Sequence, residues 1–157
     1  MTTSHPTSPV AVITGGARGI GLAIGQWFLA HGHKVVLLDI DKATLDATEQ
    51  QLARPDDVLC LHTDVSQPEQ VQAAAAKVLE RFGRVDVLVN NAGVAVFKPA
   101  LETTFQEWRH VLSTNLDGAF LCSQAFGAIM TRQRTGAIVN IASISGLRAS
   151  TLRVAYG

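Results

Sequence analysis

The chain has 157 residues, of which 47% are apolar, and its 13 Lys and Arg residues balance 13 Asp and Glu residues. This length suits one globular domain, and the apolar fraction can fill a core, which argues against a wholly disordered chain. The net charge of zero argues against a nucleic-acid partner, because such proteins carry a basic surface.

Residues that could form a disulfide, a metal site or a membrane anchor are sparse. Cys60 and Cys122 lie in apolar runs, which favours buried free thiols in a reducing compartment. The sequence has no CxxC or HExxH motif, so we expect no metal ligands. Residues 1–9 are predicted to be a polar tail, and no apolar run is long enough to span a bilayer. We therefore expect a cytoplasmic protein with no membrane partner.

Short apolar runs alternate with segments of helical periodicity along the whole chain. The first run is followed by Ile20, Ala23, Ile24, Trp27 and Phe28, which recur at helical spacing. Further helices are predicted at 41–53, at 66–83 with a Ser66–Glu69 capping box, and at 104–132 as two helices. The predicted strands are 10–14, 34–39, 58–62, 85–90 and 136–142.

Five alternations joined by short connections favour parallel strands with helices on both faces of the sheet. We therefore predict one α/β domain over residues 10–157, a doubly wound parallel sheet of the Rossmann-like type. No repeat or linker interrupts this pattern.

The segment TGGARGIG at 14–21 joins the first strand to its helix, where a dinucleotide can bind. Gly15 permits the tight turn, Gly19 lets the backbone approach a phosphate, and Gly21 allows close packing. Asp39 ends the second strand, 20 residues after Gly19. A carboxylate there can accept both ribose hydroxyls and would repel a 2′-phosphate, which favours NAD over NADP even with Arg18 nearby. The alternative is that Asp39 is only a solvated strand end.

Several motifs in the expected order resemble those of the short-chain dehydrogenases/reductases. They are TGGARGIG (14–21), Asp39, Asp64-Val65, NNAG (90–93), Asn115, Ser143 and Tyr156. The resemblance implies that Asp64 and Val65 hold the adenine, that Asn91 contacts the cofactor, and that Asn90 is mainly structural. The full set of cofactor-binding residues implied is Gly15, Arg18, Gly19, Ile20, Gly21, Asp39, Asp64, Val65, Asn91, Ala92, Gly93 and Tyr156.

The resemblance also implies a catalytic set. Tyr156 follows Ser143 by 13 residues, at the expected start of a helix, which is the family's spacing. Tyr156 would be the acid or base, Ser143 would orient the substrate oxygen, and both would bind substrate. Asn115 would support a proton relay through water. Without the other motifs, Ser143 would be interpreted as a loop residue, Tyr156 as a core residue and Asn115 as a structural one.

These residues predict an oxidoreductase that moves a hydride between NAD(H) and a secondary alcohol or ketone. The family's catalytic Lys lies four residues after the Tyr, beyond Gly157, as do its C-terminal strands and helix. We therefore expect a longer polypeptide that assembles as a homodimer or homotetramer. A polypeptide ending here should expose its fifth strand and be inactive. A non-catalytic NAD-binding module is the alternative, and a nucleotide-sugar epimerase or dehydratase fits the glycine spacing less well.

Overall fold

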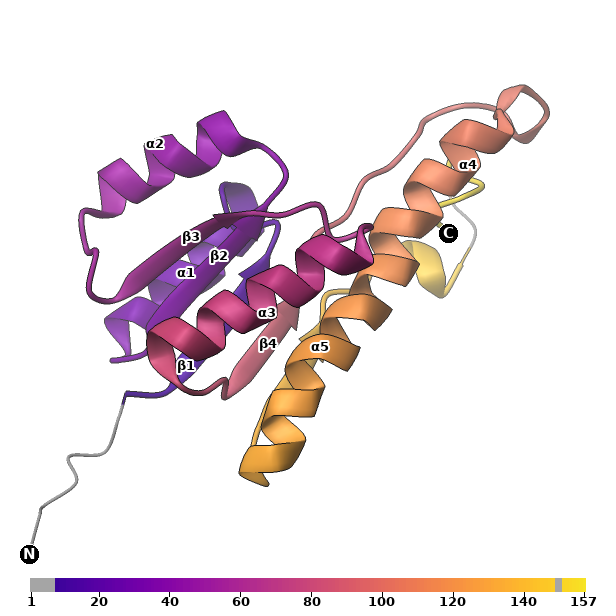
Figure 1. The fold of residues 1–157 in the computed structure, drawn as a ribbon. Helices are drawn as coiled ribbons and strands as arrows, with labels where there is room; N and C mark the ends of the chain where they lie inside the picture. Colours follow the sequence, from indigo (N-terminus) through magenta and orange to yellow (C-terminus); the bar gives the residue numbers. More distant parts are fainter. Residues whose placement is uncertain (1–7, 149–150) are drawn as a thin grey trace, which may run out of the picture.

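A parallel sheet of five strands, in the order β3-β2-β1-β4-β5, forms the centre of the molecule (Figure 1). The computed structural model describes residues 8–148 and 151–157, so most of the predicted tail lies outside the described residues. The strands are β1 (Val10–Thr14), β2 (Lys34–Asp39), β3 (Val58–His62), β4 (Val87–Asn90) and β5 (Ala137–Asn140). The helices are α1 (Gly19–Ala30), α2 (Lys42–Leu52), α3 (Pro68–Phe82), α4 (Phe105–Leu112) and α5 (Gly118–Gln133).

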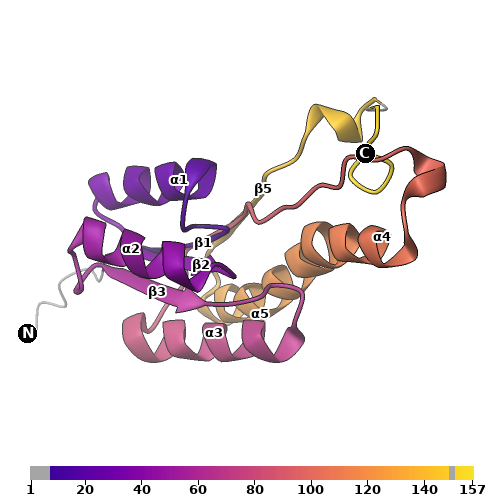
Figure 2. The ribbon, with the colours of Figure 1, turned by 90° about the horizontal axis from the view of Figure 1, so that it is seen from above.

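Helices cover both faces of the sheet, as Figure 2 shows, which confirms the doubly wound α/β prediction. Alternate residues of a strand point to opposite faces. Thus Ala11 and Ile13 of β1 pack with residues of α1 and α2, whereas Val10 and Val12 pack with residues of α3 and α5. Strands buried on both faces have the continuous apolar sequence that predicted them.

The apolar residues that predicted helix α1 face the sheet only in part, since Ile24 and Phe28 are partly buried against the core but others are exposed. Ile20 is 66% exposed and Trp27 is 56% exposed, whereas Gly21, Gly25 and Leu29 are buried. A Cβ at Gly25 would lie 2.9 Å from Leu37 Cδ2. The backbone of α1 therefore approaches β2 so closely that larger inward side chains could not fit.

The predicted capping box at Ser66 and Glu69 is wrong. Helix α3 begins at Pro68 after Gln67, whose side chain makes no cap hydrogen bond. The Ser66 hydroxyl donates instead to Asp64 Oδ1 at 2.7 Å, because Asp64 organises the turn that precedes the helix. A full capping box does occur at the start of α4, between Thr104 and Glu107.

The long helical region consists of two helices, as predicted, joined by a π-helical turn. This turn, η2 (Ser113–Asp117), contains Asn115. Gly118 follows this turn and packs on Val65, in the segment after β3. A Cβ at Gly118 would lie 2.7 Å from Val65 Cγ2. Among the described residues, no helix is long and apolar enough to cross a membrane.

Strand β5 differs from the other strands because all four of its residues are exposed. Ile138 is 40% exposed and Val139 is 45% exposed. Beyond β5 come a short 3-10 helix, η3 (Ile144–Gly146), and a turn in which Tyr156 N donates to Arg153 O at 3.0 Å. Tyr156 therefore lies in a turn and not in an assigned helix, in contrast to the prediction. A second 3-10 helix, η1 (Ala100–Glu102), precedes α4.

Candidate active site

A cleft opens at the carboxyl ends of the strands, the edge at which ligands bind in open α/β sheets. It contains eight of the residues predicted to bind a cofactor. These are Gly15, Arg18, Asp39, Asp64, Val65, Asn91, Ala92 and Gly93. The strand ends that carry these residues are adjacent in the sheet, which is why residues far apart in the sequence meet here.

The glycine turn leaves the start of α1 open to the solvent. Gly15 and Gly19 have positive φ angles of 63° and 56°, which glycine adopts without strain. Nothing lies within 4 Å of a Cβ position at Gly19, whereas one at Gly21 would lie 2.1 Å from Gly15 O. The first turn of α1 has no side-chain cap and no acidic residue. Its backbone amides are therefore available to an anion such as a pyrophosphate.

Two backbone amides fix the carboxylate of Asp39 at the end of β2. Asp39 Oδ2 accepts from Ala17 N at 3.0 Å, and Oδ1 accepts from Asp41 N at 3.0 Å. Each oxygen keeps a lone pair for a further donor. The Arg18 guanidinium lies 3.3 Å from Asp41 Oδ2. A hydrogen bond from Thr44 N, helped by the Thr44 hydroxyl, lowers the pKa of Asp41, so this acid is ionised beside Arg18.

Asn91 links the end of β4 to the glycine turn. Its Nδ2 donates to Thr14 O at 2.9 Å and to Gly15 O at 3.2 Å. Thr14 Oγ1 in turn accepts from Asn91 N and Ala92 N at 3.0 and 2.9 Å. The neighbouring Asn90 points into the fold and bonds to Ser123 Oγ and Asn140 Oδ1. These internal contacts are those expected of a structural Asn90. The bonds of Asn91 to Thr14 and Gly15 make Asn91 a structural link as well as a cleft residue.

The cleft around Asp64 includes residues that the sequence did not predict. Asp64 Oδ1 accepts from Ser66, while Oδ2 has no partner in the described part of the chain. Six further residues line the cleft, namely Leu38, Ile40, Thr63, Val94, His110 and Thr114. His110 and Thr114 are four residues apart on the helical region that contains Asn115. Their own spacing of four residues, which places both on one face of a helix, was the signal that could have linked them.

Asn115 does not line the cleft but holds one of its walls. Its Oδ1 accepts from Val94 N at 2.8 Å, and its Nδ2 donates to Val94 O at 2.9 Å. This pair of bonds fixes the loop that follows NNAG. The π-helical turn that presents Asn115 is a local distortion of a kind that is frequent at functional sites.

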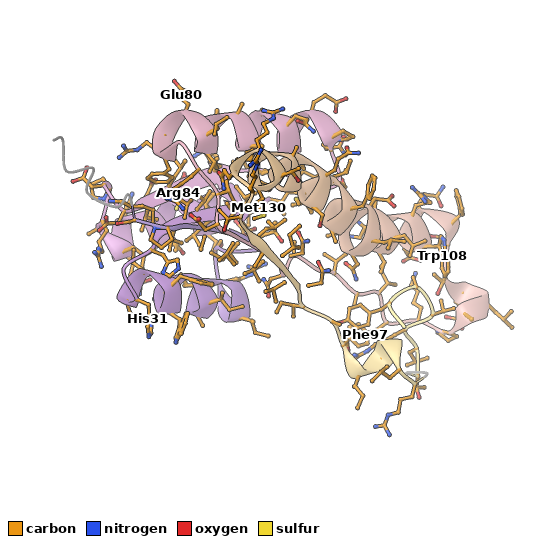
Figure 3. All side chains as sticks on the ribbon, turned by 90° about the horizontal axis from the view of Figure 1, so that it is seen from below. His31, Glu80, Arg84, Phe97, Trp108 and Met130 are labelled. Atoms are coloured by element: carbon orange, nitrogen blue, oxygen red, sulfur yellow. The ribbon has the colours of Figure 1, made fainter. Side chains whose placement is uncertain are left out.

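Ser143 and Tyr156 lie outside the cleft, in the segment that follows β5. Ser143 Oγ accepts from Ser145 N at 3.2 Å, and Tyr156 is half-buried. A Cβ at Gly157 would lie 3.3 Å from Ser145 O, so the two segments touch. This segment also meets the loop that contains Phe97, as Figure 3 shows, through a 2.9 Å bond from Lys98 N to Leu152 O. Gly19, Ile20 and Gly21 also lie outside the cleft-lining set.

The arrangement fits a dinucleotide better than it fits a metal ion. The open position at Gly19, the uncapped start of α1 and the fixed Asp39 carboxylate suit a pyrophosphate and a ribose diol. Within residues 8–148 and 151–157, no cluster of three His, Cys, Asp or Glu side chains could hold a metal ion.

Comparison with known proteins gives a consistent result. Galactitol 2-dehydrogenase (L-tagatose-forming) of Cereibacter sphaeroides is 42% identical over 136 residues, 87% of this chain and 53% of that protein. A short-chain dehydrogenase/reductase from Burkholderia phymatum in complex with NAD superposes with a TM-score of 0.91 and 38% identity, over 95% of this chain and 54% of that one. NAD+-bound xylitol dehydrogenase superposes with a TM-score of 0.90 and 30% identity, over 98% of this chain and 60% of that one.

The chain thus spans 53% of the length of that curated relative. The family model described as short chain dehydrogenase matches residues 9–157, almost the entire chain. Gly15 and Arg18 of the glycine turn and the strand-end residues of the family's motifs lie together in the cleft described above. This chain therefore belongs to the short-chain dehydrogenase family.

Proposed function

We propose that this chain contains the cofactor-binding and proton-transfer residues of an NAD-dependent oxidoreductase acting on a secondary alcohol or ketone. The observation that carries this proposal is the Asp39 carboxylate, fixed by two amides at the cleft beside the open start of α1. The NAD complexes of the two structural relatives support the same cofactor.

Different residues would bind different parts of NAD. Asp39 would accept the ribose hydroxyls, and the first-turn amides of α1, after Gly19, would bind the pyrophosphate. Asp64 Oδ2 and the backbone of Val65 would hold the adenine. Bound NAD would supply the hydride acceptor. Two anions, Asp39 and Asp41, lie where a 2′-phosphate would add negative charge, and Asp41 pairs with Arg18. NAD should therefore bind better than NADP.

Ser143 and Tyr156 would act on the substrate oxygen. During oxidation, Tyr156 would take the hydroxyl proton as the carbinol carbon loses a hydride, and the product would be a ketone. Ser143 would donate a hydrogen bond to the same oxygen and fix its direction. Asn115 would act as a positioning residue, because it fixes Val94 and so the wall beside the nicotinamide.

Substitution of Tyr156 in the full polypeptide tests the catalytic assignment. Tyr156→Phe removes only the hydroxyl, so kcat with NAD and a panel of secondary alcohols should fall about 100-fold or more. The dissociation constant for NAD should stay within about threefold, because the cleft lies elsewhere. Thr131→Val is the matched control, since it removes a hydroxyl on α5 that bonds only to Gly127 O.

Near-normal turnover by the Tyr156→Phe protein would contradict the assignment. NAD binding without oxidation of any alcohol by the unmodified polypeptide would instead select a non-catalytic nucleotide-binding module. We further propose a cytoplasmic homodimer or homotetramer that contacts neither nucleic acid nor membrane. Gel filtration with light scattering would test its oligomeric state.

A further inference from the structure

Arg153 lies between two aromatic rings beside the proposed catalytic tyrosine. Its guanidinium carbon is 4.4 Å from the centroid of the Phe97 ring and 5.9 Å from that of Tyr156. Arg153 also faces Lys98 across an isolated parallel bridge, so its backbone is fixed against the loop after NNAG. Arg153 therefore contributes a positive charge at the place where that loop and the Tyr156 segment meet.

This charge has no acidic partner in the protein as described. No carboxylate lies within ion-pair distance of Arg153 among residues 8–148 and 151–157, and the remaining residues include no Asp or Glu. The nearby Lys98 is already paired with Glu107 Oε1 at 2.6 Å. Arg132, Arg134 and Arg148 are exposed, whereas Arg153 is half-buried. Partial burial of a cation costs desolvation free energy, which pairing with an anion offsets.

Stacking on Phe97 occupies the flat face of the Arg153 guanidinium and leaves its N–H donors free. A ring interacts with the flat face of this group, while its five N–H donors point outward in the plane. No described acceptor receives a hydrogen bond from the Arg153 side chain. The free edge can therefore bind two oxygens of one anionic group in the geometry that arginine prefers.

We propose that Arg153 binds an anionic group of the substrate, so that the enzyme acts on a secondary alcohol or ketone bearing a carboxylate, sulfonate or phosphate. This inference rests on the proposed function, because it places the reacting carbinol at Tyr156. The alcohol oxygen lies at the Tyr156 hydroxyl and the anionic group at Arg153, three residues earlier in the same turn. Arg153 thereby selects among alcohols without taking part in proton transfer.

A purely structural Arg153 makes a different prediction. If the guanidinium only joined the two segments by stacking, its loss would impair all substrates equally. A substrate-binding Arg153 affects anionic substrates and spares neutral ones. The ratio of the two rates therefore separates the roles, independently of any general loss of fold.

The experiment uses the full polypeptide with NAD and matched pairs of alcohols. The pairs are 3-hydroxybutyrate with 1,3-butanediol, glycerol 3-phosphate with glycerol, and 2-hydroxypropanesulfonate with 1,2-propanediol. The unmodified protein should show a kcat/KM about tenfold or more higher for the anionic member of at least one pair. The preferred pair identifies which anion is the natural group.

Arg153→Met keeps the length and apolar stem of the side chain, so it preserves packing on Phe97. It should lower kcat/KM for the preferred anion about 10- to 100-fold, mainly through KM, and change the neutral rate less than about threefold. Arg153→Lys should restore part of the loss. Arg132→Gln is the control, because α5 ends far from the C-terminal segment in Figure 1.

Calorimetric titration of the same anions into the NADH-loaded protein gives a readout that needs no turnover. If the unmodified protein binds an anion and Arg153→Met abolishes this binding, the inference is supported. This holds even if no alcohol is oxidised, and the absence of oxidation would contradict the proposed function alone. An unchanged ratio of anionic to neutral rates in Arg153→Met, or binding that Arg153→Met leaves intact, would overturn the inference.

Discussion

The two ends of the site are held in different ways. The cofactor end is a network inside a sheet covered on both faces, where Thr14, Asn91 and the glycine turn bond to one another. The proposed substrate end follows β5, all of whose residues are exposed, and it meets the Phe97 loop through the bond from Lys98 N to Leu152 O and the stacking of Arg153 on Phe97. The packed sheet and its hydrogen bonds thus fix the position of the cleft, whereas a few local contacts fix the position of the Ser143–Tyr156 segment.

The largest expected effect is at the glycine turn. Gly21→Ala would place a Cβ 2.1 Å from Gly15 O, where backbone atoms cannot move aside cheaply. We expect the free energy of unfolding to fall by about 3 kcal/mol or more. Urea denaturation measures it. Gly127→Ala on α5 is the control, because its Cβ would lie 3.8 Å from Ile138 Cδ1 and should be tolerated. Equal stability of the two variants would break the comparison.

Two hydroxyls compare the two ends directly. Thr14 Oγ1 accepts from two amides inside the network, so Thr14→Val should cost about 2–4 kcal/mol. Ser143 Oγ accepts one hydrogen bond among the described residues, from Ser145 N, and Ser143→Ala should cost about 1 kcal/mol or less. Unfolding free energies from urea titrations would sharpen the comparison, and a larger loss at Ser143 would reverse it.

The smallest effect concerns the loop that Phe97 and Lys98 occupy. The hydrogen bond from Lys98, helped by Thr104, lowers the pKa of Glu107 to about 2 from its usual 4.5. Because the folded pKa is the lower one, ionised Glu107 contributes stability above about pH 4.5, and this contribution disappears as the pH falls toward 2.

The urea midpoints of the unmodified protein and Glu107→Gln should therefore differ most above pH 4.5 and converge in acid. Glu102→Gln, in the exposed turn η1, should show no such convergence. A pH-independent difference for Glu107→Gln would show that this ion pair does not fix the loop.

The strands and the cleft were predictable from the sequence, because buried strands are continuous apolar runs and their ends meet at one edge. The inward face of α1 was predictable only in part. Ile24 and Phe28 of its apolar stripe pack against the core, but Ile20 and Trp27 are exposed. The close contact of Gly25 with Leu37, which depends on the position of β2, was not predictable. The start of α3 was also missed, because Asp64 captures the hydroxyl of Ser66.

The candidate site was predictable in part for the same reason. Residues within motifs, such as Asp39 and Gly15, line the cleft, but His110 and Thr114 enter it from a helix far along the chain. Arg153 lies in no motif, and the role proposed for it depends on its position against Phe97, a residue distant in the sequence. The roles of Ser143, Tyr156 and Asn115 in turnover remain predictions.

The most direct test of the account is a comparison of NAD and NADP binding to the full polypeptide by calorimetric titration. Ala17 N and Asp41 N hold the Asp39 carboxylate at the cleft, where it would repel a 2′-phosphate. Arg18, the cation nearby, is already paired with Asp41, so the described cleft offers no unpaired cation to that phosphate. We predict that NAD binds at least about tenfold more tightly than NADP. Equal affinities, or tighter binding of NADP, would contradict the assignment of Asp39 and of the cofactor.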